Sequence, residues 1–293
     1  MLTRVVLDLT CKAEVKAQER SFTGFLVRGL VYEVLKSLNA DYADKLHSGR
    51  WVKYAPFSVT PPYTLEGGAI KVLNRRAPAG ARFFIEVRGL EDEFSRRFLE
   101  GLVKGFEVLR LGKDGVASVN TVSVSSTSFN ELAKAEDVGA DSFLVSFITP
   151  TFFRKDVLTA NVNPKLKSLV KEARHYLLPD PVSLFSNLHN LYCAFSRDKP
   201  PSSYRDWLSA YGLIVSEHAI KTIRVYEHPK RGLFVRGFVG RVKFDFLKDV
   251  YDKEAARWTW ILLRFAKYSN VGGGRTAGLG VVDFKPILKE GEN

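Results

Sequence analysis

The chain has 293 residues, of which 45% are hydrophobic and 26% are charged, a composition that excludes a disordered or collagen-like protein. This length exceeds the roughly 100–200 residues of a single domain and predicts two modules. The 44 Lys and Arg against 32 Asp and Glu give a net charge of +12, which indicates a polyanionic partner and favours nucleic acid over a membrane surface.

The first half of the chain predicts the order strand, helix, two strands, helix, strand. Alternating and helical periodicities define these elements, and Pro- and Gly-containing loops separate them. We expect a strand at 3–9, an amphipathic helix over 22–38, a short helical turn at 41–46, strands at 51–59 and 81–87, a helix at 91–103, and a hairpin of 106–111 with 116–125.

The second half repeats this order after residue 142. We expect a strand at 143–148, a helix at 182–195, a hairpin of 213–227 with 233–246, a helix at 252–268 and a strand at 279–284. Two units of this order predict an α+β fold of tandem ferredoxin-like (RRM-like, βαββαβ) domains, with residues 1–130 in the first and 131–293 in the second. Such a layout offers its sheet faces or a central cleft to single-stranded RNA.

A glycine-rich segment, residues 267–280, lies between the last predicted helix and the last predicted strand. A dinucleotide fingerprint needs its glycines after a strand, and a P-loop needs Lys then Ser or Thr where this chain has Leu279, so neither nucleotide motif fits. Backbone N–H donors and two cations suit phosphate oxygens, although the glycines could equally serve tight turns. The residues of this segment predicted to bind RNA are Lys267, Gly272, Gly273, Gly274, Arg275, Gly278 and Gly280.

Two further groups of cations are interleaved with aromatic residues, a pattern that suits phosphate contact with base stacking. Arg257 lies opposite the apolar face of the last helix, and Arg231 lies in the turn of the 213–246 hairpin. Ordinary solvated faces would account for each cation singly, whereas their clustering favours RNA.

The sequence contains little that indicates a metal, a cofactor or a membrane segment. Cys11 and Cys193 are too few for a disulfide framework or a zinc site, so we expect no metal and no cofactor. No apolar run reaches the length of a membrane-spanning helix, which predicts a cytoplasmic protein without a membrane partner. The single Met, beside abundant Lys, Arg and Glu, hints at a thermophilic source.

The chain resembles the CRISPR-associated endoribonuclease family that cuts repeat RNA into guide RNAs, the sixth Cas protein of the RAMP superfamily. The resemblance rests on Gly272–Gly280, which is similar to the family's glycine-rich signature, and on residues 147–154, which are similar to the motif that opens its second module. It implies the tandem ferredoxin-like fold, pre-crRNA as partner, contacts to other Cas proteins, and a monomer or homodimer.

Some members of this family place a Tyr in the first helix, a catalytic His after it and a Lys before a Pro-Phe pair. The resemblance carries these roles to Tyr32, His47 and Lys53, with Arg50 as the alternative to Lys53. It implies a metal-independent endoribonuclease in which Tyr32 and His47 share the base and acid roles, giving a 2′,3′-cyclic phosphate and a 5′-hydroxyl. From spacing alone, Tyr32 could instead be a core-edge residue and His47 a loop residue.

Two other functions remain open from the sequence. One is a non-catalytic subunit that holds guide RNA within a CRISPR effector complex. The other is a general RNA chaperone or ribosome-associated module, which would show no preference for a repeat sequence.

Overall fold

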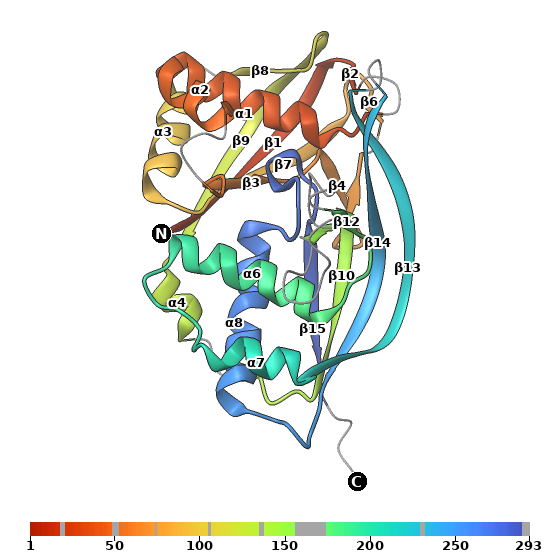
Figure 1. The fold of residues 1–293 in the computed structure, drawn as a ribbon. Coiled ribbons are helices and arrows are strands. Elements are labelled where there is room, and N and C mark those ends of the chain that lie inside the picture. The colour runs from red at the N-terminus through yellow and green to blue at the C-terminus, as the bar shows by residue number, and fades with distance from the viewer. Residues whose placement is uncertain are drawn as a thin grey trace, which may run out of the picture.

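The computed structural model describes residues 1–17, 21–48, 53–73, 75–104, 107–134, 138–155, 174–228 and 232–288. Within them, two large antiparallel sheets lie one above the other, and helices cover one face of each (Figure 1). This arrangement confirms the α+β class predicted from the sequence. No helix among the described residues is long and apolar enough to cross a membrane.

The N-terminal sheet has the strand order β5-β4-β7-β1-β9-β8, with β3 also paired to β7. Helices α1, α2 and α3 belong to this half. The bounds are β1 Leu2–Ala13, α1 Gly24–Leu38, α2 Ala40–Ser48, β3 Phe57–Val59, β4 Tyr63–Glu66, β5 Ala69–Val72, β7 Arg82–Gly89, α3 Asp92–Val103, β8 Val108–Leu111 and β9 Gly115–Thr127.

Strand β1 shows how the sequence separates the two faces of this sheet. Val5, Leu7 and Leu9 are buried in the core beneath the helices. Successive side chains of a strand point to opposite faces, so Arg4 and Asp8 lie on the face without helices. Of these two side chains, Arg4 lines the cleft described below.

The C-terminal sheet has the strand order β13-β14-β10-β15. Its elements are β10 Ser142–Thr151, α6 Pro181–Phe195, α7 Ser203–Ser209, β13 Leu213–His228, β14 Leu233–Phe246, α8 Lys253–Ser269 and β15 Val282–Ile287. In both sheets the first strand along the chain is central, because β1 lies between β7 and β9 and β10 lies between β14 and β15. The two sheets therefore share a central first strand, although the N-terminal sheet has seven strands and the C-terminal sheet has four.

Several short elements complete the fold. They are β2 Val15–Lys16 with β6 Arg76–Ala77, β11 Phe153–Lys155 with β12 Arg174–Tyr176, the helix α4 Phe129–Ala133 and the 3₁₀ turn η2 Arg275–Ala277. The β13–β14 hairpin reaches from the lower sheet towards β2 and β6 of the N-terminal half (Figure 1). There Tyr226 forms a parallel bridge with Ser21. Each half keeps its own large apolar core.

The structure differs from the sequence expectation at several elements. Residues 51 and 52 of the strand predicted at 51–59 lie outside the described residues, and of the remainder β3 takes only Phe57–Val59. The final strand begins at Val282 instead of residue 279. Gly67 and Gly68, expected in a loop, have φ of 56° and 79° and form the turn of the β4–β5 hairpin. The short helices α4 and α7 were also not predicted.

Candidate active site and RNA-binding surface

Tyr32 and His47 lie on consecutive helices that turn back on each other. Asn39 ends α1 in an extended conformation, and its side-chain oxygen accepts a hydrogen bond of 2.9 Å from the backbone N–H of Tyr42 in α2. This turn brings the two rings edge to face, with centroids 5.0 Å apart and planes at 79°. The structure therefore brings together two of the three residues that the family resemblance singled out.

The two rings differ in their surroundings. Tyr32 is half-buried and also meets the ring of Phe57 in β3, with centroids 5.9 Å apart, whereas His47 is exposed at the end of α2. Burial raises the pKa of the Tyr32 hydroxyl above its usual value, and the positive charge of Arg28 offsets part of this effect. The phenol is thus protonated at neutral pH beside an accessible imidazole.

Lys53 begins the described segment that leads into β3. Its side chain is exposed, and its Nζ lies 5.5 Å from the centroid of the Tyr54 ring. Tyr54 packs against the C-terminal core, which attaches this segment to the other half of the molecule. Arg50, the alternative to Lys53, lies outside the described residues.

The glycine-rich segment packs between the two halves, and most of its backbone donors have protein acceptors. The N–H of Gly272 donates to Asn187 Oδ1, that of Gly273 to the Phe152 carbonyl and that of Gly280 to the Pro150 carbonyl, over 2.8–3.1 Å. The N–H of Gly278 donates to the Arg275 carbonyl at 3.2 Å. We therefore correct the expectation that these N–H groups are open to phosphate, because they satisfy internal carbonyl and amide oxygens.

Close backbone approach explains why this segment needs glycine. A Cβ on Gly272 would lie 2.2 Å from the Phe152 carbonyl oxygen, and one on Gly278 would lie 2.8 Å from the nitrogen of Pro61. Gly274 is exposed, and its φ of 74° is one that glycine adopts without strain. The tight-turn alternative raised by the sequence thus accounts for much of the glycine content.

Arg275 is buried, so its guanidinium is not exposed on the surface where it could contact an RNA phosphate. Its guanidinium donates to the Ser269 carbonyl at 3.0 Å and to the Ala55 carbonyl at 3.2 Å. Burial lowers the pKa of Arg275 to about 10, so the group stays charged at neutral pH. The sequence placed this cation in an RNA contact, whereas the structure places it between α8 and the segment that carries Lys53.

The remaining predicted RNA-binding cations are dispersed. Lys267 is exposed on α8, with Nζ 2.7 Å from Asp283 Oδ1. Arg257 donates to the Ala133 carbonyl at 2.5 Å and lies over the Trp258 ring at 5.9 Å. Arg231 lies outside the described residues. Among the described residues, Lys267 is the one of these cations that lines the cleft between the two sheets.

This cleft has a volume of about 630 Å³ and is lined by residues of both sheets and of the C-terminal end of α8. Its charged side chains are Arg4, Glu86 and Arg88 from the N-terminal half and Arg241, Lys267 and Asp283 from the C-terminal half. Four cations against two carboxylates give it a positive balance. The period-two alternation of β1 and β7 was the sequence signal that could have identified Arg4, Glu86 and Arg88.

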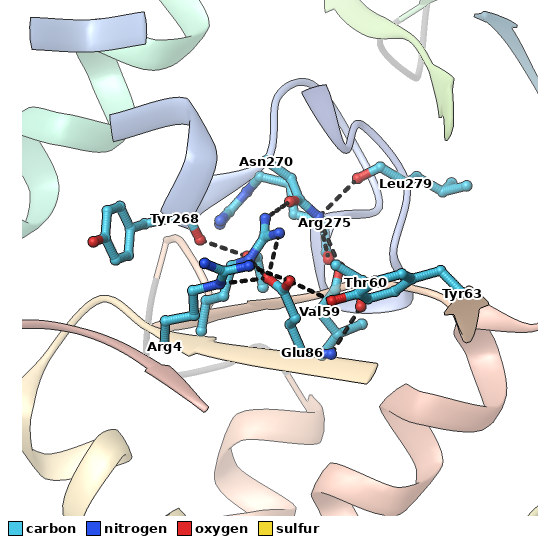
Figure 2. A network of polar contacts seen from close by, with 11 residues as sticks. Arg4, Val59, Thr60, Tyr63, Glu86, Tyr268, Asn270, Arg275 and Leu279 are labelled. Carbon is cyan, nitrogen blue, oxygen red and sulfur yellow. Dashed lines mark hydrogen bonds and ion pairs between the residues drawn. The ribbon is translucent and has the colours of Figure 1, made fainter. Parts of the chain in front are cut away.

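A buried polar network fixes one wall of the cleft (Figure 2). Glu86 accepts hydrogen bonds from Arg4 and Arg88 and, at 2.7 Å, from the Tyr63 hydroxyl. Burial opposes ionisation of Glu86, but the charge of Arg88 and the bonds from Arg4 and Tyr63 outweigh it and lower its pKa to about 2. Glu86 is therefore a carboxylate held by two cations.

Asn270 extends the network across the two halves. Its Oδ1 accepts a 2.9 Å bond from Arg88, and its Nδ2 donates to the carbonyls of Val59 and Leu279, at 2.9 Å and 3.2 Å (Figure 2). Asn270 is fully buried and has a φ of 55°. The sequence analysis missed it, although its position just before the glycines was a usable signal.

Comparisons with known proteins agree with this architecture. A Cas6 product complex superposes with a TM-score of 0.73 and 21% identity, covering 97% of this chain and 100% of that one. A Cas6 substrate mimic complex gives 0.65 and 22%, covering 97% and 99%. A Thermus thermophilus Cas6 gives 0.66 and 20%, covering 97% and 98%. These similarities concern the fold.

The sequence comparisons are more specific. The search of curated proteins found no match. Residues 145–282, which run from β10 through the glycine-rich segment, match the family model described as "CRISPR-associated endoribonuclease Cas6". The C-terminal half of the chain is therefore similar to the Cas6 family of CRISPR-associated endoribonucleases, and the whole chain shares the fold of solved Cas6 structures.

Proposed function

We propose that this chain cleaves CRISPR repeat RNA into guide RNAs without a metal ion, by attack of a ribose 2′-hydroxyl on the adjacent phosphate. The observation that carries the proposal is the edge-to-face contact of Tyr32 with His47, at 5.0 Å between ring centroids. It places two proton-transfer groups side by side at an accessible position. Both are residue types used in general acid–base catalysis.

The reaction needs two proton transfers and no external nucleophile. The 2′-oxygen forms a bond to phosphorus as its proton passes to a base, and the bond from phosphorus to the 5′-oxygen breaks as an acid protonates that oxygen. The products are a 2′,3′-cyclic phosphate and a 5′-hydroxyl. Each proton transfer contributes typically about 10²- to 10⁴-fold to the rate.

The surroundings of the two rings favour one division of these roles. The raised pKa of Tyr32 keeps its hydroxyl protonated, so it has a proton to donate to the leaving oxygen. His47 is exposed, and neutral imidazole accepts a proton readily near neutral pH. His47 is then the base and Tyr32 the acid. Lys53 offsets the negative charge that develops on the phosphorane oxygens.

The arrangement of the two halves indicates where the RNA binds. We infer that residues 1–130 and 131–293 are two ferredoxin-like units; the central first strand of both sheets, β1 and β10, supports this division. Both halves line the cleft, with Arg4, Arg241 and Lys267 along it. The cleft accepts single-stranded repeat RNA through phosphate contacts. The glycine-rich segment supports this seat mainly by holding the two halves together.

Cleavage of repeat RNA in the presence of EDTA tests the proposal. Purified protein should give one discrete cut, with a cyclic phosphate on the upstream product and a hydroxyl on the downstream one. A 2′-deoxy nucleotide at the scissile position should abolish cleavage while leaving binding intact, because it removes only the nucleophile. Intact RNA that is nevertheless bound would instead support the non-catalytic guide-RNA subunit.

A further inference from the structure

Helix α2 carries His47 but is attached to the protein by few buried side chains. Of its nine residues, Ala43 alone is fully buried, and Tyr42 and Leu46 are half-buried against the N-terminal core. Isolated helices shorter than about 12–15 residues are marginally stable in water, so α2 needs its neighbours to stay formed and in place. The position of His47 therefore depends on the contacts that attach α2 to the rest of the N-terminal half.

Two neighbouring helices hold α2 at the same residue, Tyr42. At the end of α1, the backbone N–H of Asn39 donates to the Leu35 carbonyl at 2.8 Å. The side-chain oxygen of Asn39 accepts the 2.9 Å bond from the Tyr42 N–H, so one residue ends α1 and begins α2. From α3, the guanidinium of Arg97 lies over the Tyr42 ring, 4.6 Å from its centroid. Asn39 thus fixes the start of α2, and Arg97 fixes its first large side chain.

Arg97 differs from the neighbouring Arg96 in what its guanidinium contacts. Each pairs with a glutamate one turn away in α3, Arg97 with Glu93 at 3.0 Å and Arg96 with Glu100 at 2.8 Å, and such surface pairs contribute little to stability. The side chain of Arg97 is 23% exposed and covers the Tyr42 ring, whereas that of Arg96 is 60% exposed. The contact with Tyr42 therefore distinguishes Arg97 from an ordinary surface ion pair.

We propose that Asn39 and Arg97 are positioning residues of the active site, which act on cleavage by holding the helix that carries His47. The inference rests on the proposed function, because it takes His47 to be part of the reaction. His47 lies about 7.5 Å along the helix axis from Tyr42, so a tilt of about 10° at Tyr42 moves His47 by about 1 Å. A misplacement of about 1 Å at a catalytic group costs up to about 10²-fold in rate.

Single-turnover cleavage of repeat RNA tests the two residues. Asn39→Ala and Arg97→Ala should each slow cleavage by at least about 10-fold. RNA affinity should stay unchanged, because neither side chain lines the cleft, and this affinity also shows that the variants are folded. Asn39→Asp should recover most of the lost rate, since a carboxylate oxygen accepts the same N–H bond and Asp caps helices as well as Asn does. Arg96→Ala is the matched control in α3 and should cleave at the unmodified rate, whereas unmodified rates in Asn39→Ala and Arg97→Ala would overturn the proposal.

The same substitutions in a His47→Ala background separate positioning from a general loss of structure. Residues that act through His47 should add nothing once its imidazole is removed, so neither Asn39→Ala nor Arg97→Ala should lower the residual rate further. If each substitution slowed both backgrounds equally, it would act on the fold at large and the proposal would be wrong. A slow His47→Ala beside unaffected single variants overturns the positioning roles alone, whereas a His47→Ala variant as fast as the unmodified chain overturns the proposed function as well.

Discussion

Arg275 donates a hydrogen bond to the carbonyl oxygen of Ala55, 220 residues earlier in the chain, across 3.2 Å. The same guanidinium donates to the Ser269 carbonyl at the end of α8. One buried cation of the glycine-rich segment therefore ties the C-terminal half to the segment that begins at Lys53. The glycine-rich segment therefore supports the candidate active site structurally, because it holds the segment that carries Lys53 in place.

This tie predicts that Arg275→Ala destabilises the protein. The substitution leaves two buried carbonyls without their donor, and each such loss costs about 1–3 kcal/mol, so we expect the free energy of unfolding to fall by about 3 kcal/mol. Urea denaturation measures the change. Arg96→Ala, which removes an exposed pair with Glu100, is the control and should cost less than about 0.5 kcal/mol. If the two substitutions lowered the free energy of unfolding equally, the buried contacts of Arg275 would stabilise the protein no more than an exposed ion pair does.

Glu86 predicts a loss of stability at acid pH. Its pKa is lowered to about 2 in the folded chain, below the ordinary value of 4.5, so its ionised form stabilises the fold above pH 4.5. That contribution falls as pH drops from 4.5 towards 2 and amounts to about 3 kcal/mol. Denaturation of the unmodified chain and of Glu86→Gln across this window measures it. If the free energy of unfolding fell equally with pH in both proteins, the loss of stability at acid pH would not come from Glu86.

The acid and base assignments predict opposite responses to a 5′-thio leaving group. A sulfur at the scissile 5′ position departs without protonation, so Tyr32→Phe should cleave this substrate at nearly the unmodified rate. His47→Ala should remain slow by about 10²-fold, because the 2′-hydroxyl still needs a base. Single-turnover rates on the oxygen and sulfur substrates give the comparison. If the sulfur substrate instead restored the rate of His47→Ala and not that of Tyr32→Phe, His47 would be the acid and Tyr32 the base.

The cleft predicts salt-dependent RNA binding. Arg241 is exposed along it, so Arg241→Ala should weaken binding of repeat RNA. It should also reduce the slope of log affinity against log salt by about 0.7, the value for one phosphate contact on a single strand. Lys253→Ala, an exposed cation at the start of α8, should leave the slope unchanged. If Arg241→Ala left the salt slope unchanged, Arg241 would not contact an RNA phosphate.

Strong periodicity made much of the fold predictable. Alternation in β1 and the helical spacing of α1 identify buried faces directly, whereas Tyr63 to Val72 resembled a loop because Gly67 and Gly68 dominate it. The contact of Tyr32 with His47 was not visible in the sequence, since it depends on how sharply the chain turns at Asn39. Likewise, charge alone suggested that Arg275 meets phosphate, and only its burial shows which oxygens it satisfies.

The rate of RNA cleavage by His47→Ala tests the central claim most directly. Under single-turnover conditions with repeat RNA and EDTA, this variant should be slower than the unmodified chain by at least about 10²-fold, with RNA affinity unchanged. His218→Ala, which removes another exposed histidine on β13, should cleave at the unmodified rate. Cleavage by His47→Ala as fast as that by His218→Ala would contradict a catalytic role for the Tyr32–His47 pair.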